Sequence, residues 1–151
     1  DTDLGLRGRL AGWEALLATK AIVYHKYSKT GGVFSPFKIY LVERNHYWVA
    51  LKNFPLSMLV FVPIFTIIRY FVQALLVFSG KGSGGEFRAS GSRGVLIMAI
   101  LKGAWDAFTG TPRMLAKRLR IMRARNISGR EMAQLLKKYR MSFSELLDYP
   151  V

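Results

Sequence analysis

Three charged residues at the start of the chain have a spacing that could support acid–base chemistry. Asp1 and Asp3 are one residue apart, and Arg7 follows Asp3 by four positions. On a helix, Asp3 and Arg7 would form an i,i+4 pair that holds the acidic end in place. A helix end held in this way could position a neighbouring carboxylate to accept a proton. A purely structural role is equally open, because acidic residues favour helix N-termini through the helix dipole.

A second block places a histidine between an apolar run and a glycine loop. Residues 21–24 (Ala-Ile-Val-Tyr) are predicted to form a short buried strand, bounded by polar residues. His25, Lys26 and Ser28 follow it and lead to Gly31-Gly32. A single histidine beside a strand is more often structural than a ligand, whereas the N–H groups of a glycine loop can contact phosphate oxygens.

A third block is a predicted helix from about residue 36 to residue 52. Ser35 is suited to the N-cap, with Pro36 at the first helical position. The helix should stop at Asn53-Phe54-Pro55. It carries Arg44 and Asn45 near its middle.

In this order, the three blocks resemble the family-2 glycosyltransferases, which are inverting sugar transferases with a GT-A fold. In that family the first block is Glu-Asp-x-Asp-Leu-x-x-Arg, followed by an aliphatic residue, Ala-Gly and an aromatic residue. The stretch from Asp1 to Trp13 lacks only the leading Glu, which would precede residue 1. The histidine loop, Arg44-Asn45 and Lys52-Asn53-Phe54-Pro55 match later blocks of bacterial members. The resemblance covers about the first third of the chain.

The resemblance implies an α/β fragment. It would comprise the C-terminal end of a GT-A Rossmann-like domain, followed by mainly α-helical membrane-associated segments. Neither the nucleotide-binding half nor its Asp-x-Asp metal motif is found in this sequence. We therefore expect the chain to be the C-terminal part of a larger enzyme and inactive by itself.

The resemblance also implies roles for individual residues. Asp1 would be the base that accepts the acceptor proton, and Asp3 would be the second acid of the motif. His25 would bind a divalent metal ion (Mg or Mn) or the donor diphosphate. The remaining predicted substrate-binding residues are Arg7, Lys26, Ser28, Arg44 and Asn45. For Arg44 the alternative is a solvated helix face, with its guanidinium bonded to Glu43 or Asp3.

The composition combines a high apolar content with a strong positive charge. Of 151 residues, 51% are hydrophobic, the formal net charge is +14, and there is no cysteine. The lack of cysteine excludes disulfides and thiolate metal sites. Apolar content with excess Lys and Arg is typical of proteins at an anionic membrane surface. We predict no nucleic-acid partner, because the basic residues of 113–140 are interleaved with Leu and Met rather than with stacking aromatics.

Three segments are predicted. They are the catalytic-domain part at 1–53, a hydrophobic helical hairpin at 54–109 and basic amphipathic helices at 110–151. The apolar run 54–78 is long enough to reach across a hydrocarbon core of about 30 Å. Arg69, however, would cost about 2.5–3.5 kcal/mol at the centre of a spanning helix. Thr66, Arg69 and Gln73 share one helical stripe, which should face protein or lipid headgroups.

Basic residues flank the hairpin on both sides, so the positive-inside tendency places both flanks on the cytosolic side. We therefore predict association with the cytoplasmic face of the inner (plasma) membrane, through a re-entrant hairpin or helices lying in its plane. The predicted function of the intact parent enzyme is sugar transfer from a nucleotide-diphosphate-sugar donor to a membrane-linked glycan acceptor. The alternative is a small basic membrane-anchored binding module without catalysis. That alternative explains the composition, but not the order of the three blocks.

Overall fold

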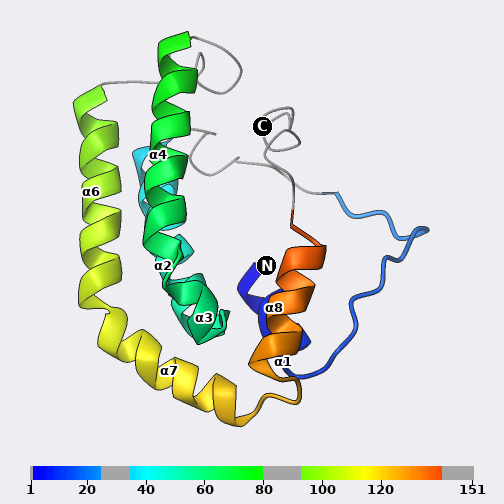
Figure 1. Ribbon diagram of the computed structural model, residues 1–151. Helices are drawn as coiled ribbons and strands as arrows, with labels where there is room; N and C mark the ends of the chain where they lie inside the picture. Colours follow the sequence, from blue (N-terminus) through cyan, green and yellow to red (C-terminus); the bar gives the residue numbers. More distant parts are fainter. Residues whose placement is uncertain (1, 25–34, 80–92, 141–151) are drawn as a thin grey trace.

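The computed structural model describes residues 2–24, 35–79 and 93–140 (Figure 1). Asp1, His25, Lys26 and Ser28, all predicted site residues, lie outside these ranges. The helices, in chain order, are α1 (Thr2–Leu10), α2 (Pro36–Asn53), α3 (Leu56–Leu59), α4 (Val62–Ser79), α6 (Arg93–Thr109), α7 (Thr111–Arg123) and α8 (Gly129–Lys138).

The predicted α/β fold is wrong. All regular secondary structure in the described residues is helical, with neither strand nor sheet among them. Residues 21–24, predicted as a buried strand, are irregular and exposed; Val23 and Tyr24 keep 84% and 93% of their surface accessible. A short apolar run becomes a strand only where a neighbouring strand pairs with its backbone. The described part of the chain provides no such neighbour.

Helix α2 begins and ends as its sequence predicts. Ser35 is the N-cap, and its hydroxyl oxygen accepts a hydrogen bond from the backbone N–H of Lys38 at 3.2 Å. Pro36 occupies the first turn, where its missing N–H costs nothing. At the other end Phe54 is extended (ψ 146°), as expected for a residue that precedes a proline.

The ends of α1 and α8 also follow local rules. Gly12 has φ +83° and closes α1, with Trp13 N–H donating to the Gly8 carbonyl at 2.9 Å and Gly12 N–H donating to that of Arg9 at 3.0 Å. This is the Schellman arrangement, which requires the left-handed conformation that glycine readily adopts. Helix α8 starts with a capping box between Ser128 and Glu131.

The most extensive packing is between α2 and α6, and it depends on small residues. A Cβ atom on Gly103 would lie 2.8 Å from the Cβ of Glu43, and one on Gly110 would lie 2.5 Å from the indole of Trp48. Gly103 lies with Leu96, Ala99 and Ala107 on the buried face of α6, and Gly110 follows the end of that helix, so the two backbones approach closely. The Trp48 indole N–H donates to the Ala107 carbonyl at 3.1 Å. Close helix packing through small residues is typical of helices in membranes.

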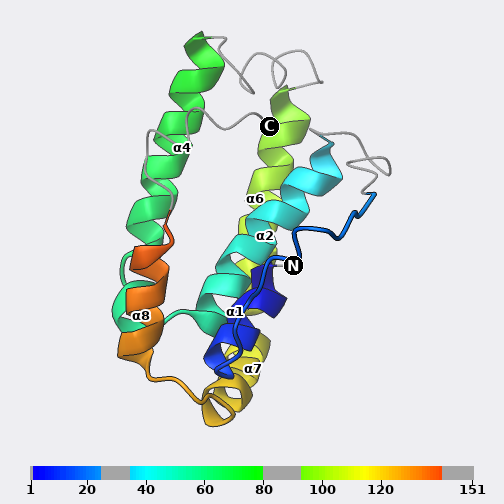
Figure 2. The same cartoon turned by 90° about the vertical axis from the view of Figure 1, so that its right-hand side faces the viewer.

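Helix α4 has its polar side turned inward. In Figure 2 its ribbon lies apart from those of α2 and α6. Hydrogen bonds between side chains connect α4 to α2. Both oxygens of Glu43 accept hydrogen bonds from the Arg69 guanidinium, at 2.9 and 2.7 Å, and the Tyr70 hydroxyl donates to the same carboxylate at 2.6 Å. Thr66 is 4% exposed. The prediction that the stripe of Thr66 and Arg69 faces protein is confirmed. The side chain of Gln73 is not among those that the structure describes.

Helix α7 closes one end of α2. The Arg118 guanidinium reaches the C-terminus of α2 and donates to the carbonyl oxygens of Leu51 and Phe54, at 2.7 and 2.8 Å. A cation is favourable there, because the last carbonyls of a helix carry partial negative charge. Arg118 and Met114 form the buried side of α7, whereas Leu115 and Leu119 remain partly exposed.

Glu43→Gln should lower the free energy of unfolding by about 3 kcal/mol, because Arg69 would keep a largely buried charge without its counter-ion. In the Glu43→Gln background, Arg69→Met should lower the free energy of unfolding much less than it does in the wild-type protein. Urea unfolding of the wild type, the two single variants and the double variant would measure this. Additive losses would contradict a coupled pair.

The same pair predicts a pH dependence. Burial acts to raise the pKa of Glu43, but the hydrogen bonds from Arg69 and Tyr70 and the charge of Arg69 outweigh it, so the net pKa is lowered from 4.5. The unfolded chain therefore takes up this proton first. Stability should be complete above about pH 4.5 and fall as the pH drops below that value. Glu43→Gln should show a smaller decrease in the same acid titration.

Candidate functional site

The acidic residue of α1 is bound to the C-terminal end of α2. Asp3 Oδ1 lies 2.7 Å from the ammonium of Lys52 and accepts a hydrogen bond from the side-chain amide of Asn53 at 2.8 Å. Asp3 Oδ2 lies 3.2 Å from Arg7 Nε, so the i,i+4 pair expected from the spacing is present. Three groups thus hold one carboxylate, and two of them come from a segment about fifty residues away. The contact joins the first and third blocks of the sequence.

The surroundings of Asp3 keep its carboxylate ionised. Partial burial acts to raise its pKa, but the hydrogen bonds from Lys52 and Asn53 and the charges of Lys52 and Arg7 prevail and lower it. A general base works best with a pKa near the working pH. Asp3 is therefore suited to fixing α1 rather than to taking a proton from a substrate.

Asp3, Arg7, Lys52 and Asn53 form what we call the Asp3 network, and Asn53 is its most enclosed member. It is fully buried, and its amide group donates both to Asp3 and to the Val49 carbonyl, at 2.8 and 3.0 Å. Its side-chain oxygen is buried without a hydrogen-bond partner. Neither Asn53 nor Lys52 was a predicted site residue. The only sequence signal for them was the Lys-Asn-aromatic-Pro block at the end of the predicted helix.

Arg44 and Asn45 belong to a different part of α2. The Arg44 guanidinium donates to the Tyr40 hydroxyl at 3.0 Å and to Asn45 Oδ1 at 3.2 Å, and it lies 4.5 Å from the centroid of the Trp48 ring. The Tyr40 hydroxyl in turn donates to Asp106 of α6 at 2.7 Å. Arg44 is eight residues before Lys52, about 12 Å along the helix axis. The structure therefore places Arg44 and Asn45 near α6 and away from the Asp3 network.

The predicted metal site cannot be located from the described residues. They hold no group of three His, Asp or Glu side chains arranged to bind a metal ion. His25, to which the metal was assigned, is outside the described ranges, so that assignment stays a prediction. The described histidine, His46, has Nε2 3.5 Å from the Thr66 hydroxyl.

Helices α4 and α6 expose large apolar side chains. On α4 these side chains surround the inward polar stripe, and on α6 they lie opposite the small residues that contact α2. The exposed set includes Ile64, Phe65, Ile67, Phe71, Ile97, Met98, Leu101, Trp105 and Phe108. This distribution is the reverse of that of a helix in water, which turns its apolar face to the core.

Among residues 2–24, 35–79 and 93–140, no helix has both the length and the apolar character needed to cross a membrane.

The chain matches no known family model, no curated protein and no solved structure. The resemblance to family-2 glycosyltransferases therefore depends on the three sequence blocks.

Asp3→Asn should loosen α1 from α2. The new amide can still form hydrogen bonds with its neighbours, but the charge that holds Lys52 and Arg7 is lost. At this partly exposed site the loss should lower the free energy of unfolding by about 1–2 kcal/mol. Hydrogen exchange of the α1 amides should become faster. Glu14→Gln, an exposed site with the same change in charge, is the control. Unchanged α1 protection in Asp3→Asn would show that the network does not hold the helix.

Proposed function

We propose that this chain is the acceptor-side part of an inverting glycosyltransferase. The intact parent enzyme would transfer a sugar from a nucleotide-diphosphate-sugar donor to a glycan acceptor held at a membrane. The observation that carries the proposal is the Asp3 network, in which the acidic helix binds Lys52 and Asn53 of the third block. Two stretches singled out for one resemblance thus form one structural unit.

In this proposal the base is Asp1, which directly precedes α1 in the sequence. Asp1 takes the proton of the acceptor hydroxyl, whose oxygen bonds to the anomeric carbon while the bond from that carbon to the diphosphate breaks. Anchoring of α1 by Asp3, Arg7, Lys52 and Asn53 makes the helix after the base a fixed support. Accurate placement of a base is a large part of catalysis.

The leaving nucleotide diphosphate needs compensation for its charge. We assign this role to a divalent metal ion (Mg or Mn) at His25, aided by Lys26 and Ser28. These three residues lie outside the described ranges, and their assignment depends on the sequence blocks. Arg44 and Asn45 are retained as acceptor-side candidates because Arg44 lies across two aromatic rings on a partly accessible face of α2.

The apolar faces of α4 and α6 support a membrane-bound acceptor. Helix α4 buries Thr66, α6 buries mainly small residues beside Leu96, and both helices expose large apolar side chains. Large apolar surfaces of this kind mark places where another protein or a membrane binds. Helix α7 follows α6 directly and carries Arg113, Lys117, Arg120 and Arg123 in exposed positions. Apolar helices beside cations suit the interface of an anionic membrane on its cytoplasmic face.

A membrane-anchored binding module without catalysis is the second candidate. The exposed apolar faces and the basic α7 support it as well as they support the transferase. It does not require Asp1 or the Asp3 network for any chemical step. Transfer activity of the intact parent therefore separates the two candidates.

Asp1→Asn in the intact parent enzyme should abolish sugar transfer and leave donor binding intact, because only the proton acceptor is removed. His25→Ala should instead weaken metal-dependent donor binding. Product formation from radiolabelled donor and donor titration would measure the two effects. Near-normal turnover of Asp1→Asn would show that the base is assigned wrongly, and an unchanged metal requirement of His25→Ala would make that residue structural.

Replacing exposed apolar residues of α4 should weaken membrane binding without unfolding the protein. Phe65→Ser with Phe71→Ser removes two side chains that are 67% and 65% exposed. The control is Leu16→Ser with Leu17→Ser, each 88% exposed in the segment after α1. Sedimentation with anionic vesicles should show that the α4 pair lowers the affinity for the vesicles by at least about tenfold. Each aromatic side chain that becomes buried in the membrane contributes about 1.5–3 kcal/mol to the binding free energy. Equal losses in both pairs would exclude α4 as the docking helix.

A further inference from the structure

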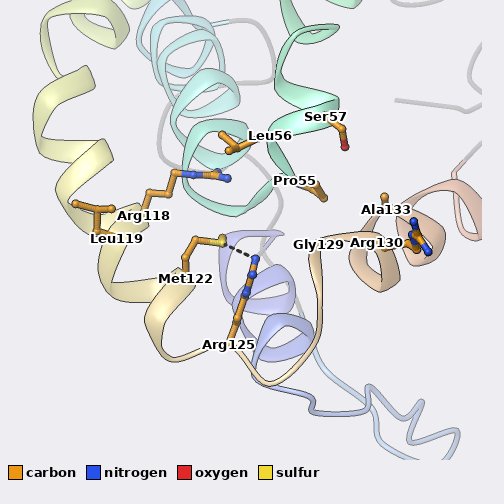
Figure 3. Close-up of a pocket in the computed structure, with 10 residues that line it drawn as sticks. All are labelled: Pro55, Leu56, Ser57, Arg118, Leu119, Met122, Arg125, Gly129, Arg130 and Ala133. Atoms are coloured by element: carbon orange, nitrogen blue, oxygen red, sulfur yellow. Dashed lines mark hydrogen bonds between the residues drawn. The ribbon is translucent and has the colours of Figure 1, made fainter.

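An open pocket of about 640 Å³ lies between the start of α3, the outer side of α7 and the first turns of α8. Figure 3 shows its lining. Leu56 belongs to α3, Leu119 and Met122 come from α7, and Ala133 comes from α8. These side chains, with Pro55, make most of the lining apolar. None of the residues that line the pocket belongs to the Asp3 network.

Three arginines accompany this apolar lining. Arg118 lies on α7, Arg125 in the connection to α8 and Arg130 in the first turn of α8. None of the ten described residues that line the pocket is acidic. Burial and the nearby charge of Arg125 lower the pKa of Arg118, so the two guanidinium groups repel each other. A bound anion would relieve this repulsion, and guanidinium groups bind phosphate oxygens through paired hydrogen bonds.

The three arginines are not equally available to a ligand. Arg118 already donates to the two carbonyl oxygens at the end of α2. Arg125 and Arg130 are exposed, and the contact that Arg125 makes with Met122 Sδ is long, 3.7 Å. Arg118 is therefore fixed as part of the wall. Arg125 and Arg130 are the exposed cations of the lining, and because Figure 3 draws their side chains apart from each other, both would have to turn toward a shared anion.

The apolar lining defines the rest of the ligand. Leu56 and Leu119 are 70% and 59% exposed, so hydrocarbon can contact them at the mouth of the pocket. Exposed apolar residues continue from there, through Val60 and Phe61, into α4. An inorganic anion would leave this surface in water. An amphiphile that carries a phosphate beside a hydrocarbon chain would use both parts of the pocket.

We propose that this pocket binds the phosphate headgroup of a membrane lipid, with Arg125 and Arg130 on the phosphate and Leu119, Met122 and Leu56 against the first part of the chain. The ligand class is a lipid phosphomonoester, with either acyl or polyprenyl chains. The lining of the pocket shares no residue with the proposed transfer site. Occupancy of the pocket can be measured without any sugar transfer, so failure of one proposal leaves the other intact.

The first test compares two pairs of cationic residues in the same chain. Arg125→Gln with Arg130→Gln removes two charges from the pocket, and Lys20→Gln with Lys137→Gln removes two exposed charges outside its lining and away from α7. Binding is measured to phosphatidylcholine vesicles that contain a minor fraction of phosphatidic acid or polyprenyl monophosphate. The pocket pair should lose about tenfold in affinity and the control pair no more than about threefold, because the control acts only through screened long-range attraction. Equal losses would overturn the proposal.

The second test changes the shape of the pocket and leaves its charge unchanged. Ala133→Phe should fill the cavity and reduce binding to phosphatidic acid vesicles by about tenfold. Binding to phosphatidylglycerol vesicles of equal surface charge should be almost unaffected, because it requires only the surface cations. Circular dichroism would confirm that the variant is folded. Parallel losses on both vesicles, or displacement of the protein by inorganic phosphate at the lipid's own concentration, would show a general cationic surface instead of a lipid site.

Discussion

The carboxylate of Glu43 is the interaction on which the arrangement of the long helices depends. It lies on α2 and bonds to Arg69 and Tyr70 of α4, and the Cβ of Glu43 faces Gly103 of α6, where an added side chain would not fit. Without this counter-ion, Arg69 would be a charge within an apolar helix, which is costly in any environment of low polarity. The ion pair therefore sets which side of α4 faces the protein. The other sides of α4 carry exposed apolar side chains.

Helix α2 organises the other end of the structure through its C-terminus. Arg118 binds the last carbonyls of the helix, and Lys52 and Asn53 bind Asp3. The proposed catalytic helix, the apolar helices and the basic α7 are thus all connected to one element. The C-terminus of α2 thus contacts both Asp3 of α1 and Arg118, which forms a wall of the pocket. A membrane-bound acceptor would suit such an arrangement, since the surface that meets lipid and the helix next to the proposed base share one support.

The site was predictable only in part. The Asp3–Arg7 pair follows from four-residue spacing, and it is present. Lys52 and Asn53 could be noticed as a block, but no local rule connects them to an acid about fifty residues earlier. Arg44 was expected near the acceptor or bonded to Glu43 or Asp3, and its partners are Tyr40, Asn45 and the Trp48 ring. Long side chains choose among several partners within reach, and the packing of α6 against α2 decides between them.

The sequence by itself determined the ends of α2, the polar stripe of α4 and the combination of apolar content with positive charge. Each of these depends on residues within a few positions of one another or on composition alone. Only the tertiary structure decided that residues 21–24 form no strand, that α6 turns its small residues inward, and that α3, α7 and α8 enclose an arginine-rimmed pocket. These outcomes require distant backbones to meet. These contacts depend on the close packing that Gly103 and Gly110 permit and on the ion pairs around α2. Neither can be predicted from a local sequence pattern.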